Sequence, residues 1–142
     1  VGCAEGVFLD RAIKSYSCEA VGIELNKKAA VISRSKNIDV REKELSDLVE
    51  NESDSFDSIF TFQVLEHIPK PLPFIRDSVS LLKKGGRYIV SVPNNDSFIK
   101  NSELNVLNMP PHHQGLWGKR SLSYLEEVLP WNLIAIHYEP LQ

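Results

Sequence analysis

The sequence predicts an α/β fold, Rossmann-like and doubly wound, with a mostly parallel sheet. Two observations favour this fold. Short apolar segments alternate with amphipathic helical segments, and a turn rich in small residues, VGCAEG at residues 1–6, leads directly into the first helical segment. Such alternation is typical of a parallel sheet covered by helices on both faces, and these sheets bind ligands beyond the carboxyl ends of their strands. The residues that follow each strand are therefore the candidate binding residues.

The first half of the chain predicts helical segments alternating with strands. Residues 5–16 carry apolar side chains at helical spacing, and the polar stretch 43–55 has Leu45, Leu48 and Val49 at the same spacing. Asn26 is a possible N-cap for a helix over residues 26–37. The expected strands are short apolar or β-branched runs at residues 19–25, 38–42 and 56–63.

The second half continues the alternation but contains one long connection. A helix is expected over 71–86, ended by two lysines and then Gly85 and Gly86, and a strand is expected over 87–93. Residues 94–118 form a polar connection, and loops of that length are uncommon unless they have a function. A helix over 119–129 and a last strand over 131–140 complete the prediction.

Composition narrows the classes of protein. A chain of 142 residues favours a single domain, residues 1–142, and its net charge of −3 favours neither nucleic acid nor an anionic membrane as a partner. The sequence has no apolar run long enough to span a membrane. Cys3 and Cys18 lack metal-site spacing, so we interpret them as reduced thiols of a cytoplasmic protein.

The opening turn is a candidate binding site. Gly2 and Gly6 match neither the P-loop nor the dinucleotide fingerprint, and Glu5 would repel a pyrophosphate. A cofactor without phosphate fits better, although a plain strand-to-helix turn is an alternative. Glu24 ends the next strand, where an acid can accept hydrogen bonds from ribose hydroxyls; the alternative is an exposed carboxylate with no ligand. The order and spacing of turn and acid favour a nucleoside site.

Four segments in this order, VGCAEG, VGIELN, FDSIFTFQVLEHIPKP and LLKKGGRYIVSVPN, resemble the class I S-adenosylmethionine-dependent methyltransferases. VLEHIPKP and GGRYIVSVPN are most similar to the branch that includes ubiquinone-pathway O-methyltransferases. The resemblance covers residues 1–95 strongly. It implies transfer of a methyl group from S-adenosylmethionine to an oxygen or nitrogen of a small-molecule acceptor.

The resemblance also implies roles for individual residues. Gly2, Cys3, Ala4 and Gly6 would form the turn beside the methionine part of the cofactor, with Ala4 in place of the family's middle glycine. Glu24 would bind the ribose, with Leu25 beside the adenine. Phe62 and Gln63 would line the sulfonium side, and a further adenine contact would fall within 41–45. The family's central first strand and its last strand have no counterpart in the sequence, so we expect a truncated sheet.

Histidines are the candidate general bases for an oxygen nucleophile. His67 follows a strand, and His112 and His113 lie in the long connection, whose PPHHQGLW segment resembles the family's active-site loop; structural or surface roles are the alternatives. Some relatives bind a divalent metal through Glu-x-x-Glu-His. Here Gln63 replaces the first carboxylate, so no metal is expected, although Glu66, His67 and a loop histidine could still form a weak site.

Two other functions remain open from the sequence. A non-catalytic binding module with the same fold is one alternative. A nucleotide-dependent oxidoreductase is the other, although the glycine spacing argues against it.

Overall fold

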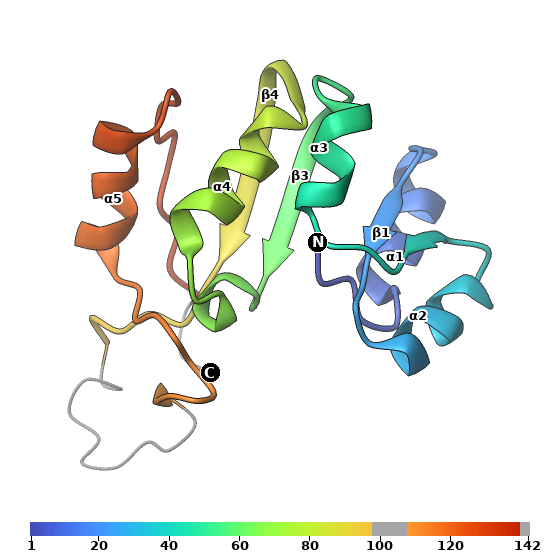
Figure 1. Ribbon diagram of the computed structural model, residues 1–142, viewed down its shortest axis with the longest axis horizontal. Helices are drawn as coiled ribbons and strands as arrows, with labels where there is room; N and C mark the ends of the chain where they lie inside the picture. Colours follow the sequence, from blue (N-terminus) through green and yellow to red (C-terminus); the bar gives the residue numbers. More distant parts are fainter. Residues whose placement is uncertain (98–107, 140–142) are drawn as a thin grey trace. The chain divides into compact units, whose positions relative to one another are not determined.

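The computed structural model (Figure 1) describes residues 1–97 and 108–139. It divides into two compact units. Unit 1 comprises Val1–Phe62 and Leu72–Val90, and unit 2 comprises Gln63–Pro71 and the described residues from Ser91 onward. Part of the expected 94–118 connection and the end of the expected 131–140 strand lie outside the described residues. The single domain over 1–142 stays a prediction.

Helices and strands alternate along unit 1 as the sequence predicts. Its elements are α1 (Val7–Tyr16), β1 (Val21–Ile23), α2 (Lys27–Arg34), β2 (Asp39–Arg41), α3 (Ser46–Glu52), β3 (Phe56–Phe62), α4 (Pro71–Ser80) and β4 (Leu82–Ser91), the last two having one terminal residue in unit 2. Unit 2 contains the short 3₁₀ helix η1 (Leu65–His67) and α5 (Lys119–Val128).

The strands form two pairs, β1–β2 and β3–β4. β1 and β2 are parallel, with Gly22 opposite Val40. In the second pair the Phe56 N–H donates to Leu81 O near the start, and the Gln63 N–H donates to Ser91 O at the far end. Hydrogen bonds that advance along both strands together are those of a parallel pair, and the arrows in Figure 1 point the same way.

The first three residues contact both strand pairs. The Val1 amino group donates to Phe60 O at 2.7 Å, and the N–H groups of Gly2 and Cys3 donate to Ile23 O at 2.8 and 3.0 Å. The expected sheet is therefore present as two parallel pairs that are connected through residues 1–3. These bonds also fix the opening turn at the carboxyl end of β1.

Two apolar clusters stabilise unit 1. The larger joins buried side chains of both strand pairs and α3, namely Ile23, Leu45, Leu48, Ile59, Leu81 and Leu82. The smaller, Ala30, Ile38 and Val40, packs against Cys3, Leu9 and Ile13. Because Cys3 lies in the opening turn and Leu9 in the helix that follows it, this second cluster holds the turn against α2 and β2.

Helix α2 begins where the sequence predicts. The Asn26 side-chain oxygen accepts hydrogen bonds from the N–H groups of Lys28 at 3.0 Å and Ala29 at 3.3 Å, so the predicted N-cap is confirmed. Such a cap satisfies backbone donors that have no partner inside the helix.

The predicted end of the helix over 71–86 is wrong. α4 ends at Ser80, and residues 83–86, expected as a basic and glycine helix terminus, lie in β4. Leu81 and Leu82 are both buried in the core, and Leu81 O already accepts from the Phe56 N–H of β3. Core packing and strand pairing therefore start β4 before the lysines.

The predicted last strand is also wrong for its described part, residues 131–139, which have no strand structure. Ile134 is 81% exposed, and the Leu133 N–H donates to the Glu126 carboxylate instead of to a strand. A β-branched run forms a strand only when a neighbouring strand completes its hydrogen bonds, and no strand within residues 1–97 and 108–139 pairs with this one.

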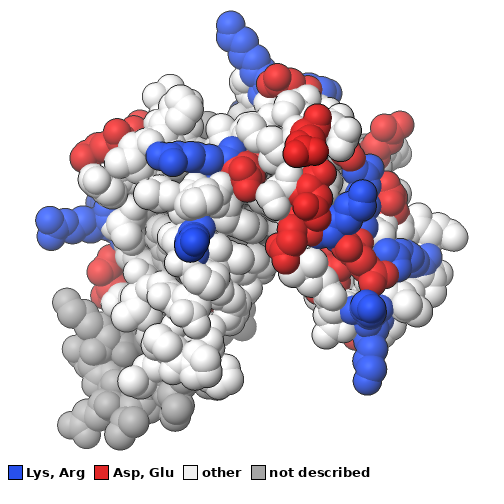
Figure 2. Space-filling model, viewed as in Figure 1, with Lys and Arg blue, Asp and Glu red and all other residues white. Residues whose placement is uncertain are grey.

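Charged side chains of both signs are unevenly spread over the face drawn in Figure 2, much of which is uncharged. Acidic side chains gather over α3 and its neighbouring loops, with lysines and arginines beside them. Among the described residues, no helix combines the length and the apolar character that a membrane span requires.

Candidate functional site

The opening turn has a backbone that few residues adopt. Gly2, Ala4 and Gly6 all have positive φ angles, of 66°, 46° and 72°. The Gly6 N–H donates to Cys3 O at 2.8 Å and closes the turn, and α1 begins at the next residue. Glycine takes positive φ at no steric cost, whereas Ala4 takes it with strain. Gly2 and Ala4 are exposed, so this backbone faces solvent between β1 and α1.

Gly6 differs from the rest of the turn because it is buried. A Cβ atom at this position would lie 2.1 Å from Ser33 Oγ and 2.7 Å from Ile38 Cδ1. The missing side chain therefore lets the start of α1 approach α2. This is a packing role, and the contact with a cofactor predicted for Gly6 stays a prediction.

The Glu24 carboxylate connects the turn to the start of α2. Its Oε2 accepts the Ala4 N–H at 2.8 Å, and its Oε1 accepts the Asn26 N–H at 2.7 Å. Glu24 is half-buried directly after β1, at the strand end that the sequence predicts. A carboxylate oxygen has two lone pairs, so each oxygen retains one acceptor direction. Leu25 follows with 58% of its surface exposed.

Cys3 and Phe62 complete the predicted cofactor residues of unit 1. Cys3 is half-buried, and burial first, with the nearby Glu24 charge second, raises the pKa of its thiol. Phe62, at the end of β3, forms an aromatic cluster with Phe60 and with Phe8 of α1, with ring centroids 5.0 to 5.8 Å apart. The structure thus joins Phe62 to the helix that follows the turn.

The structure does not single out one residue of 41–45 as the predicted adenine contact. Arg41 pairs with Glu52 and Asp39, and Glu42 pairs with Arg34. Leu45 belongs to the buried core.

In unit 2, Gln63 adopts a positive φ of 54° immediately after β3. Its side-chain nitrogen donates to Ser91 Oγ at 3.2 Å, and its backbone N–H donates to Ser91 O. The two strand ends therefore carry a polar pair. Strained non-glycine backbone is found preferentially at functional sites.

Two of the three predicted histidines form one cluster in unit 2. The rings of His67 and His113 meet edge to face, with centroids 5.0 Å apart. His67 Nδ1 lies 2.6 Å from the His112 backbone oxygen, and His113 Nδ1 lies 2.9 Å from Asn108 Oδ1. His112 thus joins the cluster through its main chain, and its exposed imidazole makes no hydrogen bond to any other described residue.

Glu66 extends this histidine cluster. Its backbone oxygen accepts the N–H groups of Gln114 and Gly115, which ties η1 to the loop that carries the histidines. Its side chain is 1% exposed, and its Oε2 has no hydrogen-bond partner among the described residues. One possible ligand atom from each of Glu66, His67 and His113 lies within 4.8 Å of the others. The expectation that the protein has no metal stays a prediction.

Sequence reasoning missed Asn108. Asn108 belongs to no recognisable motif. The only indication in the sequence is that it lies five positions before His113 in an unusually long connection. The side-chain contact that gives it meaning appears only in the folded loop.

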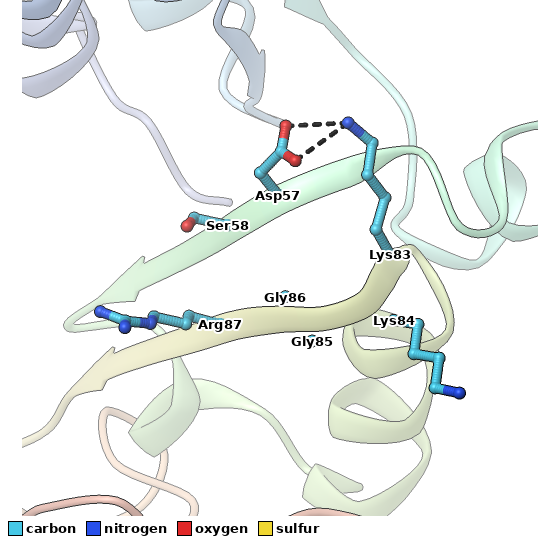
Figure 3. Close-up of a pocket in the computed structure, with 7 residues that line it drawn as sticks. All are labelled: Asp57, Ser58, Lys83, Lys84, Gly85, Gly86 and Arg87. Carbon is cyan, nitrogen blue, oxygen red and sulfur yellow. Dashed lines mark hydrogen bonds and ion pairs between the residues drawn. The ribbon is translucent and has the colours of Figure 1, made fainter.

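A shallow pocket of about 350 Å³ lies elsewhere in unit 1 (Figure 3). It is lined by Asp57, Ser58 and residues 83–87, and Lys83 Nζ bonds both oxygens of Asp57 at 2.9 and 3.0 Å. Most of these residues lie in the first halves of β3 and β4. The pocket is therefore at the amino end of these strands, opposite to the edge where parallel sheets bind ligands.

Comparison with known proteins shows the family of the chain. A family model described as a methyltransferase domain matches residues 1–136. The chain belongs to this methyltransferase family. A relative, the ubiquinone biosynthesis O-methyltransferase of Xanthomonas campestris, is 33% identical over 100 residues, which cover 66% of this chain and 41% of that relative. The match thus spans less than half of the relative's length.

Solved structures support the same fold for this methyltransferase-family chain. A SAM-dependent methyltransferase from Archaeoglobus fulgidus has a TM-score of 0.74 at 19% identity, covering 92% of this chain and 58% of that one. The plantazolicin methyltransferase BpumL, solved in complex with a pentazolic desmethylPZN analog and SAH, has a TM-score of 0.67 at 15% identity, covering 91% of this chain and 55% of that one. The predicted Rossmann-like α/β fold and the resemblance to class I S-adenosylmethionine-dependent methyltransferases are confirmed.

Proposed function

We propose that the protein transfers a methyl group from S-adenosylmethionine to an oxygen or nitrogen of a small-molecule acceptor. The observation that carries this proposal is the Glu24 carboxylate, which is bonded to the Ala4 and Asn26 N–H groups at the carboxyl end of β1. Family membership supports the same reaction. The turn itself presents Cys3, Ala4 and Glu5, and the acidic side chain of Glu5 disfavours a phosphate there.

The residues present fit the cofactor. The two backbone bonds hold the Glu24 carboxylate in one orientation, and its remaining lone pairs suit the two hydroxyls of a ribose. Gly2 and Ala4 would lie beside the methionine part, and Leu25, exposed after Glu24, beside the adenine. Phe62 and Gln63 would line the sulfonium side. When bound, S-adenosylmethionine supplies a methyl group on a good leaving group.

The protein's main contribution to the rate is to position the acceptor. An acceptor that loses a proton also needs a base. We assign this role to the cluster of His67 and His113, because each ring has Nδ1 bonded to an oxygen and leaves Nε2 for another partner. The imidazole of His112 has no such anchor and is the weaker candidate. The two free cysteines, Cys3 and Cys18, support a reducing, cytoplasmic location.

Calorimetric titration of the protein with S-adenosylmethionine, S-adenosylhomocysteine and NAD is the first test. Binding of the first two without NAD is expected. Release of S-adenosylhomocysteine is then measured on a panel of phenols, sugars and amines, and turnover on any of them supports the reaction. Binding without turnover on every acceptor would favour a non-catalytic module, and preference for NAD would favour the oxidoreductase.

A further inference from the structure

In unit 2, the side-chain amides of Asn95 and Asn108 form a hydrogen-bonded chain. The chain runs from the backbone oxygen of Trp117, just before α5, to the ring of His113. Asn95 is its anchor. The Asn95 side-chain nitrogen lies 3.2 Å from Pro93 O and 3.3 Å from Trp117 O, and its backbone N–H donates to the same Trp117 oxygen at 2.9 Å. Carbonyl oxygens only accept hydrogen bonds, so the NH₂ end of this amide faces them. Asn95 Oδ1 therefore points to the other side.

Asn108 occupies that other side. Its side-chain nitrogen lies 2.6 Å from Asn95 Oδ1. Because Asn95 Oδ1 can only accept, Asn108 must present its NH₂ group there. The orientation of the second amide thus follows from the first, and its oxygen is left for a different partner.

That partner is His113. Asn108 Oδ1 lies 2.9 Å from His113 Nδ1. An amide oxygen has no proton to give, so the proton of a neutral His113 is on Nδ1, and Nε2 keeps its lone pair. Both Asn95 and Asn108 are half-buried, as is His113, which limits competition from water for these bonds.

We propose that Asn95 and Asn108 are positioning residues that hold His113 in the tautomer with Nε2 unprotonated, so that Nε2 accepts the proton of the methyl acceptor. This inference rests on the proposed methyl transfer. The acceptor atom forms a bond to the methyl carbon, and the electron pair of the broken carbon–sulfur bond leaves with sulfur. The acceptor's O–H or N–H bond breaks, its electrons stay with the acceptor, and the proton forms the new Nε2–H bond of His113.

His67 is held in the same tautomer by a simpler arrangement. Its Nδ1 lies 2.6 Å from the His112 backbone oxygen, which also only accepts. No side chain takes part in this bond, so changing Asn108 should leave the His67 tautomer as it is. His67 is therefore an internal reference for His113 in the same protein.

The first test is nuclear magnetic resonance of the imidazole nitrogens, which reports the tautomer without any turnover. In the parent both His67 and His113 should carry the proton on Nδ1. Asn108→Leu removes the acceptor at similar size, and Asn95→Leu removes its anchor. Both variants should shift His113 toward the other tautomer and leave His67 unchanged. An unchanged His113 tautomer in Asn108→Leu would overturn the proposal.

The second test is kinetic, on whichever acceptor the panel identifies. Asn108→Leu should lower kcat by about tenfold or more, a part of the ~10²–10⁴ that a general base contributes, with the KM for S-adenosylmethionine unchanged. Asn108→Asp retains an acceptor toward Nδ1 but loses the donor to Asn95 Oδ1, so it should recover only part of that loss. An equal loss in the control Asn132→Leu, an exposed asparagine near α5, would overturn the proposal.

Two further outcomes are informative. Loss of turnover in the parent after treatment with a chelator would overturn the role of Nε2 as a base, since a metal would then use it. If Asn108→Leu is unfolded by circular dichroism, the tautomer of His113 in Asn108→Asp decides: Nδ1 protonated supports the proposal, and Nε2 protonated overturns it. Failure of the proposed methyl transfer would appear as no turnover in the parent while the tautomer result stands.

Discussion

The Ala4 N–H donates to Glu24 Oε2 across a 2.8 Å hydrogen bond, which joins the opening turn to the acid after β1. The bond matters because the two residues are twenty positions apart and belong to different predicted motifs. It orients one carboxylate oxygen, and the Asn26 N–H orients the other. The turn and the acid thus form one preorganised unit before any ligand binds.

Glu24→Ala should weaken binding of S-adenosylmethionine strongly. The change removes two charge-assisted hydrogen bonds to ribose, each about 1.5–3 kcal/mol, and it also releases the Ala4 and Asn26 amides. Calorimetry measures the affinity. Glu5→Ala is the matched control, because Glu5 is an exposed acid of the same turn whose backbone oxygen, not its carboxylate, binds Lys36. Affinity of Glu24→Ala within threefold of the parent would contradict the ribose assignment.

Gly6→Ala should destabilise the fold more than it affects the ligand. Its new Cβ would meet Ser33 Oγ and Ile38 Cδ1, and overpacking of this kind costs about 1–3 kcal/mol. Gly85→Ala separates this effect from backbone strain, since Gly85 has a φ of +81° but no atom within 4 Å of the added Cβ. Its cost should be the strain alone, about 1–2 kcal/mol. Equal free energies of unfolding for the two variants would show that Gly6 has no packing role.

Cys3 should react with iodoacetamide more slowly than Cys18. Burial and the Glu24 charge raise the pKa of the Cys3 thiol, so less thiolate is present at neutral pH, whereas Cys18 is exposed. Mass spectrometry of the two peptides over time gives both rates. In urea the difference should disappear. Faster labelling of Cys3 than of Cys18 in the folded protein would contradict the position of Cys3 in the structure.

The fold was predictable wherever a local pattern coincided with a core position. The β-branched run at 56–62 became β3, and Asn26 capped α2, because each pattern acts within a few residues. The prediction from the lysine and glycine pairs put the end of α4 too late in the chain, because such residues also occur at the start of a strand. The 131–139 run was misjudged because a strand depends on a distant partner.

The candidate site was predictable only in part for a similar reason. Glu24 and the turn follow from spacing along the chain, and the three histidines follow from residue type. Nothing local distinguishes His113 from His112. That distinction comes from Asn108, which bonds only one of the two rings in the folded loop.

The histidines should therefore separate by mutation. His113→Ala should lower turnover by about 10²–10⁴, the usual contribution of a general base. His112→Ala should lower turnover less, since the loop keeps the backbone oxygen that bonds His67. Initial rates and S-adenosylmethionine affinity are measured for each, with His67→Ala alongside. A larger loss in His112→Ala than in His113→Ala would refute the assignment of the base.

The most direct measurement is a titration of the ¹⁵N-labelled protein with S-adenosylhomocysteine, followed through its amide resonances. We expect the amides of Cys3–Gly6 and Glu24–Asn26 to shift first and to saturate together, because the ligand contacts the turn and the Glu24 carboxylate at once. NAD at the same concentration should leave them unshifted. Shifts confined to the pocket of Asp57 and Lys83, or an equal response to NAD, would contradict a cofactor site at the turn.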